Sequence, residues 1–196
     1  MAQFNKFSNT AFKEKIKIMT QIILLVGESG SGKTTIADLL EEMYGYKVLK
    51  SYTTRPPRLN DTSHVFITDK EFDKLKDIVA YTEYNGYRYC ATADQVDNSD
   101  IYVIDPDGIE KLKNIYHGKK ELVDVYLRVP EEIRASRMKK RGDSDTQIAS
   151  RLDYDKKAFA SYYPAFIVDN SQEELDIAID KIVNIINLYK QEPAAE

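Results

Sequence analysis

Residues 27–35 read GESGSGKTT and stand between an apolar run, IILLV at 22–26, and a segment with helical spacing, TIADLLEEMY at 35–44. They fit the pattern G-x-x-x-x-G-K-S/T, and a strand before it and a helix after it are the context in which this pattern binds phosphates. Glycines let backbone N–H groups turn toward phosphate oxygens, and the helix N-terminus adds partial positive charge. The stretch therefore predicts a nucleoside triphosphate site.

Within this phosphate loop (residues 27–35), Lys33 is expected to reach the β- and γ-phosphates, and the Thr34 hydroxyl is expected to bind Mg²⁺. The residues predicted to bind ATP are Gly27, Glu28, Ser29, Gly30, Ser31, Gly32, Lys33, Thr34 and Thr35.

Apolar runs alternate with helix-spaced segments along most of the chain. The runs that read as strands are 22–26, 47–51, 101–105, 122–129 and 165–168, and the segments with helical spacing include 35–44, 130–141 and 171–190. Strands alternating with helices predict an α/β fold with a parallel core sheet flanked by helices.

Residues 62–98 break this alternation. HVFIT at 64–68, a short helix with a Thr68…Glu71 capping box, and two strands around Asn85-Gly86 predict a small antiparallel insert. The expected domains are an extension over 1–20, a core over 21–61 and 99–190 with a lid at about 137–151, the insert over 62–98, and a tail over 191–196.

Composition limits the classes of protein and partner. The 196 residues fit one domain, and 28 Lys and Arg against 32 Asp and Glu give a net charge of −4, without the basic surface that a duplex-binding protein needs. The single cysteine, Cys90, cannot form an internal disulfide, and IILLV is too short to span a membrane. We expect a cytoplasmic monomer or homodimer that binds small-molecule nucleotides, with neither nucleic acid nor membrane as a partner.

A second anion site is indicated by SYTTRPPR at 51–58. Arg55 and Arg58 each offer forked donors to a phosphate, and Pro56-Pro57 fixes the backbone between them. The stretch follows a predicted strand near the carboxyl edge of the sheet, where ligands of parallel sheets bind. Beside the phosphate loop, this arrangement favours a phosphotransferase that holds a phosphorylated acceptor.

Two other classes of protein are alternatives to a phosphotransferase. DPDG at 105–108 matches the D-x-x-G element of GTPases, but no N-K-x-D motif follows it, so a GTPase or ATPase switch is the alternative. A protein-binding module is the third alternative, and the intact phosphate loop at 27–35 favours an enzyme over it.

Over residues 21–190 the sequence resembles the guanylate kinase family. The phosphate loop is followed by S-x-T-T-R-x-x-R at 51–58, and HVFITDKEF at 64–72 is similar to that family's Y-x-F-V-S-x-x-E-F. YCAT at 89–92 stands where the family has Y-G-S/T, and IYVIDPDG at 101–108 is similar to L-D-I-D-x-Q-G. SRMKKRG at 136–142, with Arg151, looks like the arginine-bearing lid.

The resemblance implies a nucleoside monophosphate kinase that moves the γ-phosphate of ATP to a nucleotide such as GMP or dGMP, with Mg²⁺ as cofactor. The acceptor-binding residues that it implies are Ser51, Arg55, Arg58, His64, Tyr89 and Asp105. The catalytic residues would be Lys33, Arg137, Arg141 and Arg151, and the metal ligands Thr34 and Asp105.

The positions that read guanine depart from the family's pattern. Ala80 stands in place of a glutamate and Ala91 in place of a hydroxyl residue, and neither alanine side chain can form a hydrogen bond. Glu83 lies three positions from Ala80 and so points to the opposite face of a regular strand. Our hypothesis is that the acceptor carries a different or modified base or a deoxyribose. A phosphorylated sugar is the alternative acceptor.

Overall fold

The computed structural model describes residues 21–57, 61–84, 86–172 and 175–189. The predicted extension (1–20) and tail (191–196), together with Arg58 and Asn85, lie outside these residues. Five strands form the core sheet in the order β2-β7-β1-β8-β9, and every neighbouring pair is parallel. The strands are β1 (Gln21–Val26), β2 (Val48–Leu49), β7 (Ile101–Val103), β8 (Glu121–Arg128) and β9 (Phe166–Asp169).

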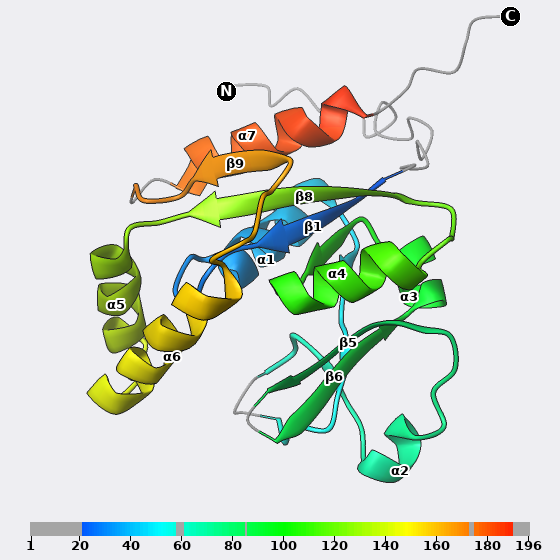
Figure 1. Cartoon of the computed structure of the whole chain (residues 1–196). Helices are drawn as coiled ribbons and strands as arrows, with labels where there is room; N and C mark the ends of the chain where they lie inside the picture. The colour runs from blue at the N-terminus through cyan, green and yellow to red at the C-terminus, as the bar shows by residue number, and fades with distance from the viewer. Residues whose placement is uncertain (1–20, 58–60, 85, 173–174, 190–196) are drawn as a thin grey trace, which may run out of the picture.

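Helices cover both faces of this sheet, as Figure 1 shows. On one face Ile23 and Leu25 of β1 pack with α1 (Lys33–Tyr44) and α7 (Leu175–Leu188). On the other face Ile22, Leu24 and Val26 pack with α4 (Pro106–Ile115) and with part of the second sheet. Alternate residues of one buried strand thus serve two cores, which is the pattern of a parallel strand covered on both sides. The predicted fold class is confirmed.

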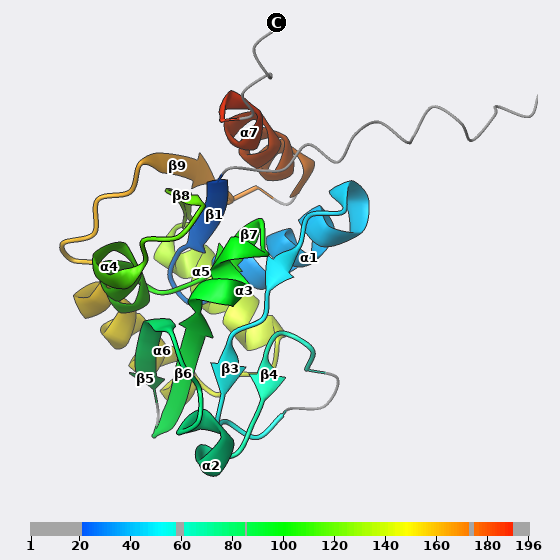
Figure 2. The ribbon, with the colours of Figure 1, turned by 90° about the vertical axis from the view of Figure 1, so that its right-hand side faces the viewer.

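The second sheet has four strands in the order β4-β3-β6-β5. They are β3 (Tyr52–Thr53), β4 (Val65–Phe66), β5 (Ile78–Tyr84) and β6 (Tyr87–Thr92), and this sheet lies below the core in Figure 2. Pairing of β5 with β6 is antiparallel, as predicted, whereas β3 and β4 are parallel. Because β3 precedes residue 62, the sheet includes residues on the core side of the predicted insert boundary.

Short helices flank the second sheet. In α2 (Asp69–Phe72) Thr68 and Glu71 form the predicted capping box. The helix α3 (Ala93–Asp97) begins after β6 and carries its own capping box, formed by Thr92 and Gln95. None of the described helices is both long enough and apolar enough to cross a bilayer.

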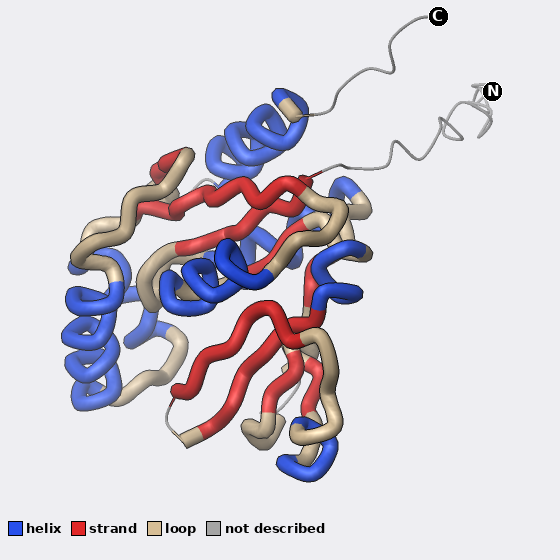
Figure 3. Tube along the Cα trace, turned by 45° about the vertical axis from the view of Figure 1, so that its right-hand side comes forward, coloured by secondary structure: helices blue, strands red, loops and turns tan. Residues whose placement is uncertain are grey.

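Two helices, α5 (Glu131–Lys140) and α6 (Asp145–Ala158), lie side by side beyond the carboxyl ends of β1 and β8 (Figures 1 and 3). Ser144 caps α6 through a hydrogen bond from the backbone N–H of Gln147. The connection between the two helices therefore ends at Ser144, because the capping box starts α6 at Asp145.

Candidate active site

The phosphate loop joins β1 to α1, as the sequence predicts. Gly30 and Gly32 have φ values of +81° and +90°, in the left-handed region that favours glycine. A Cβ atom on Gly30 would lie 2.7 Å from the backbone oxygen of Arg134, and one on Gly32 would lie 2.7 Å from Nδ2 of Asn170. The loop is thus tightly packed against α5 and the end of β9, and at both glycines a side chain would displace a neighbour.

Lys33 folds back over this loop. Its Nζ donates to the backbone oxygens of Gly27 at 2.6 Å and Glu28 at 3.2 Å. Desolvation lowers the pKa of Lys33 to about 8, and the negative charge of Asp155 opposes that shift. The ammonium group therefore lies in a poorly hydrated place beside the loop, where a phosphate oxygen would be a better partner than a carbonyl.

A cavity of about 830 Å³ opens on the outer side of the loop, and we call it the donor cavity. Several of the residues predicted to bind ATP line it: Ser29, Gly30, Gly32, Lys33, Thr34 and Thr35. The three predicted catalytic arginines, Arg137, Arg141 and Arg151, line the same cavity, so the fold brings both sets together.

Each of these arginines has a protein partner. Arg137 Nη2 donates to the backbone oxygen of Asn170 at 2.9 Å, and Arg141 pairs with Asp143. Arg151 Nε lies 3.6 Å from Oδ2 of Asp143. Only Arg151 also lines the second cavity described next, so among the three it is the one that borders both.

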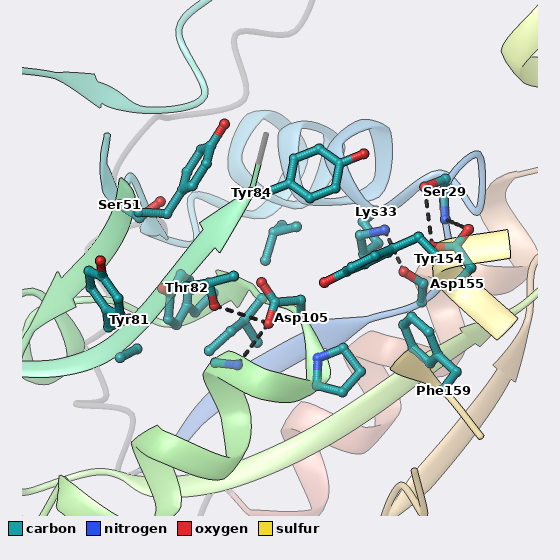
Figure 4. Close-up of a pocket in the computed structure, with 18 of the residues that line it drawn as sticks. Ser29, Lys33, Ser51, Tyr81, Thr82, Tyr84, Asp105, Tyr154, Asp155 and Phe159 are labelled. Carbon is teal, nitrogen blue, oxygen red and sulfur yellow. Dashed lines mark hydrogen bonds between the residues drawn. The ribbon is translucent and has the colours of Figure 1, made fainter. Parts of the chain in front are cut away.

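The second cavity, of about 260 Å³, lies between the phosphate loop, the β5–β6 pair and α6, and we call it the acceptor cavity (Figure 4). Four predicted acceptor-binding residues line it: Ser51, His64, Tyr89 and Asp105. Ser51 Oγ lies 2.9 Å from Nδ1 of His64, whose ring contacts that of Tyr89 at a centroid distance of 5.5 Å. The fold thus assembles these side chains from separate segments.

Arg55 is the predicted acceptor residue that the fold places elsewhere. It does not line the acceptor cavity; its Nη2 lies 2.6 Å from Oδ2 of Asp61, and its guanidinium lies over the ring of Phe66. The Arg55–Asp61 ion pair is a contact that the SYTTRPPR motif alone does not indicate.

Asp105 links the acceptor cavity to the core. It is the N-cap of α4, and its Oδ1 accepts from the backbone N–H of Gly108 at 2.7 Å and from Oγ1 of Thr82 at 3.2 Å. Burial raises the pKa of this carboxyl group, against the effect of those hydrogen bonds. Thr34 lines the donor cavity and Asp105 the acceptor cavity, so the two predicted metal ligands border different spaces.

The two substituted positions for reading guanine lie opposite one another. Ala80 of β5 and Ala91 of β6 are partners in the antiparallel pair, and both are buried among apolar residues. Glu83 is exposed and accepts a hydrogen bond from Tyr81, so it does not replace a reader, as expected from its place on the strand. The Thr92 side chain caps α3, where it accepts a hydrogen bond from the backbone N–H of Gln95.

Residues of α6 contribute most of what the motifs missed. Asp155 and Tyr154 both line the acceptor cavity, and Asp155 accepts a hydrogen bond from the backbone N–H of Ser29 at 2.9 Å. Arg134, one helical turn before Arg137 in α5, is buried and pairs with Asp155 at 3.2 Å. The sequence signal for Asp155 is its spacing from Arg151: it follows that arginine by about one helical turn, so the two side chains lie on the same face of the helix.

Comparisons with known proteins agree with this geometry. A family model described as an AAA domain matches residues 23–174. Guanylate kinase from Neisseria gonorrhoeae is 30% identical over 182 residues, which cover 85% of this chain and 86% of that protein. The chain belongs to the guanylate kinase family. The expected phosphotransferase class is confirmed: the protein is an ATP-dependent nucleoside monophosphate kinase.

The chain is also similar to a solved structure of a guanylate kinase and to a ribose 1,5-bisphosphate phosphokinase. The crystal structure of guanylate kinase from Anaplasma phagocytophilum has the same fold, with a TM-score of 0.60 and 20% identity over 90% of each chain. Ribose 1,5-bisphosphate phosphokinase from Pantoea vagans is 29% identical over 143 residues, which cover 68% of this chain and 80% of that protein.

Proposed function

We propose that this kinase transfers the γ-phosphate of Mg·ATP to the phosphate of a nucleoside or deoxynucleoside monophosphate, either GMP or dGMP or a nucleotide with a related base. The observation that carries the proposal is the junction of the two cavities. Ser29, Lys33 and Arg151 line both the donor and the acceptor cavity. A phosphate bound in each would meet at Lys33, where positioning and neutralisation of charge supply most of the catalysis in phosphoryl transfer.

On the donor side, backbone N–H groups of the phosphate loop and Lys33 would hold the triphosphate. Arg137, Arg141 and Arg151 would exchange their present protein partners for phosphate oxygens, and the segment that carries them would form the lid. We also propose the domain boundaries expected from the sequence, with the lid at about 137–151.

The residues present fit Mg²⁺, which takes few ligands from protein and keeps several waters and phosphate oxygens. Thr34 supplies a hydroxyl group in the donor cavity, and Asp105 supplies a carboxylate at the carboxyl end of β7. Within the described residues no group of three or more Asp, Glu, His or Cys side chains forms a protein cage for a metal ion. When bound, the ion would neutralise charge on the β- and γ-phosphates.

On the acceptor side, Ser51, His64 and Tyr89 would hold the acceptor phosphate, and Arg58 stays a predicted contact. An oxygen of the acceptor phosphate attacks the γ-phosphorus in line, and the bond from that phosphorus to the β,γ-bridging oxygen breaks to release ADP. Lys33 and Arg151 lie where the charge of the transferring group develops, so no covalent enzyme intermediate is needed.

A kinase of a phosphorylated sugar is the second candidate. It is favoured by the methyl groups of Ala80 and Ala91, which leave the guanine-reading positions without hydrogen-bonding atoms. The match to a ribose 1,5-bisphosphate phosphokinase points the same way. We also propose a cytoplasmic enzyme, a monomer or homodimer, in line with its single, buried cysteine.

The test is a coupled assay of ADP release with Mg·ATP and a panel of ribo- and deoxynucleoside monophosphates, with ribose 5-phosphate and ribose 1,5-bisphosphate included. Stimulation of ADP release by one or more nucleotides, with the diphosphate as product, is the expected result. Release at the same rate without any acceptor would instead indicate a nucleotide switch. Stimulation only by a phosphorylated ribose would select the second candidate.

A further inference from the structure

The two positions that read guanine in the family give the acceptor cavity no means of selecting a base by hydrogen bonds. Ala80 is 2% exposed and Ala91 is fully buried; they are partners across the β5–β6 pair and belong to the same buried cluster as Val96 and Tyr102. A site that hydrogen-bonds its substrate discriminates by leaving groups unpaired when the wrong substrate binds, by factors of about 10⁴ or more. These two positions cannot discriminate in that way.

The carboxylate of Asp105, which would bind either Mg²⁺ or the acceptor, does not select a base either. Its Oδ1 is engaged by Thr82 and Gly108, whereas its Oδ2 makes no hydrogen bond within the described residues and is turned toward the cavity (Figure 4). A carboxylate oxygen accepts hydrogen bonds from N–H groups, and each of the common bases carries an N–H on its pairing edge. This oxygen therefore does not distinguish one base from another.

Several aromatic rings line the acceptor cavity. Tyr154 of α6 meets Tyr84 of β5 edge to face, with ring centroids 5.4 Å apart and an interplanar angle of 68°. Both rings line the cavity, together with Phe159 and Tyr102, and Tyr154 keeps 37% of its surface exposed. In Figure 4 the Tyr154 ring extends from α6 into the space between Lys33 and Asp105. Stacking on such a ring tolerates any base, since every base has a π-face.

We propose that Tyr154, which lies in α6 just beyond the lid, recognises the acceptor's base through ring contact, and that this kinase accordingly accepts both purine and pyrimidine nucleoside monophosphates. The inference rests on the proposed function, because it assumes a nucleotide acceptor. It assigns the base to the space bounded by Tyr84, Tyr154 and Asp105, and it makes α6 a contributor to acceptor binding as well as to the donor cavity.

The first arm of the test compares GMP, AMP, CMP and UMP as acceptors under the same conditions. Recognition by stacking predicts kcat/KM values that fall within about 100-fold of one another. A preference for one base by about 10⁴ would overturn the inference, while stimulation by that nucleotide would still support the proposed function. The two hypotheses therefore fail on different results.

The second arm uses substitutions at Tyr154. Tyr154→Ala should raise the acceptor KM about tenfold for every base and leave the KM for ATP within about twofold, whereas Tyr154→Phe keeps the ring and should stay near wild type. Tyr163→Ala is the matched control, because Tyr163 is 87% exposed and lines neither cavity. An unchanged acceptor KM, or an equal rise in the KM for ATP, would contradict a role in recognising the base.

Ribose 5-phosphate completes this arm because it carries no base. Tyr154→Ala should leave any activity with it unchanged, and it should be a poorer acceptor than the nucleotides. If the substitution reduced that activity as strongly as it reduced activity with nucleotides, Tyr154 would act by holding the lid and the inference would be wrong. If a phosphorylated ribose surpassed every nucleotide, the proposed function itself would fail.

Discussion

The carboxylate of Asp155 in α6 accepts a hydrogen bond from the backbone N–H of Ser29, with 2.9 Å between the nitrogen and Oδ2. Arg134 of α5 donates to the same oxygen at 3.2 Å and lies 3.4 Å from the backbone oxygen of Ser29. The two lid helices thus bind both polar backbone groups of one residue in the phosphate loop. Because Ser29 borders both cavities, the placement of the lid fixes the boundary between donor and acceptor.

Replacing Asp155 should therefore weaken both folding and catalysis. Asp155→Ala leaves the buried guanidinium of Arg134 with only the more distant carboxylate of Glu28, 3.9 Å away, and loss of one partner from a buried ion pair costs about 3–5 kcal/mol. Asp155→Asn keeps an oxygen for the Ser29 N–H and should lose less. The free energy of unfolding and kcat/KM for ATP are the measurements.

Asp153 provides the control for Asp155, since it lies on the same helix and pairs with Lys157 at 2.7 Å in an exposed position. Asp153→Ala should change the free energy of unfolding little, as is usual for surface pairs. If Asp155→Ala were no more destabilising than Asp153→Ala, the contact with Ser29 would have no part in holding the lid.

Lys33 should give the enzyme an alkaline limit. Its pKa is lowered to about 8 by desolvation, so the ammonium group is charged below that pH and loses its proton as the pH rises through 8. Because only the charged form attracts phosphate, kcat/KM for ATP should fall above about pH 8. The measurement is a pH profile of kcat/KM for ATP at saturating acceptor.

Two variants separate the charge of Lys33 from other titrating groups. Lys33→Arg keeps its charge at alkaline pH, so whatever activity it retains should not fall above pH 8. Lys33→Ala should lower turnover by about 10²–10³ with little change in the fold. A wild-type profile that stayed level up to pH 9.5 would show that the lysine is charged throughout.

The contact between Ser51 and His64 predicts a selective effect on the acceptor. His64→Phe keeps a ring beside Tyr89 and removes the nitrogen that lies 2.9 Å from Ser51 Oγ. The acceptor KM should rise by about tenfold, the usual order for one lost hydrogen bond to a charged group, while the KM for ATP stays constant. His117, the other histidine, is exposed, so His117→Phe is the control. Equal effects of the two substitutions would remove His64 from the acceptor site.

Local patterns explain which features were predictable from sequence. The phosphate loop depends on neighbours in the chain: a buried strand, glycines that permit positive φ, and a helix that starts at Lys33. The opposition of Ala80 and Ala91 follows from a hairpin whose last pair is Tyr84 with Tyr87, because the turn fixes the register. Both features are determined by a few residues that lie close together in the sequence.

Contacts between distant segments escaped prediction for a physical reason. Ser29 and Asp155 lie 126 positions apart, and no periodicity indicates which side chain of a polar helix will face a loop. Helical spacing alone does not indicate that Arg134 is buried, because its burial depends on how α5 packs against the phosphate loop near Gly30. The Arg55–Asp61 ion pair likewise depends on how a loop folds, which the arginines alone do not specify.

The close approach of the loop to α5 supplies the last prediction. Ala at position 30 would place its Cβ 2.7 Å from the backbone oxygen of Arg134, so either the loop or the start of α5 must move. Gly30→Ala should therefore raise the KM for ATP at least tenfold, because a shift of about 1 Å at a reacting site can cost 10²-fold in rate.

Gly45→Ala is the matched control: Gly45 also has a positive φ, of +71°, but a Cβ there meets nothing within 4 Å. That control should lower stability by about 1–2 kcal/mol, the cost of the left-handed backbone, and leave the KM for ATP unchanged. If both variants bound ATP equally well, the loop would tolerate displacement, and its packing against α5 would have no role in positioning the donor.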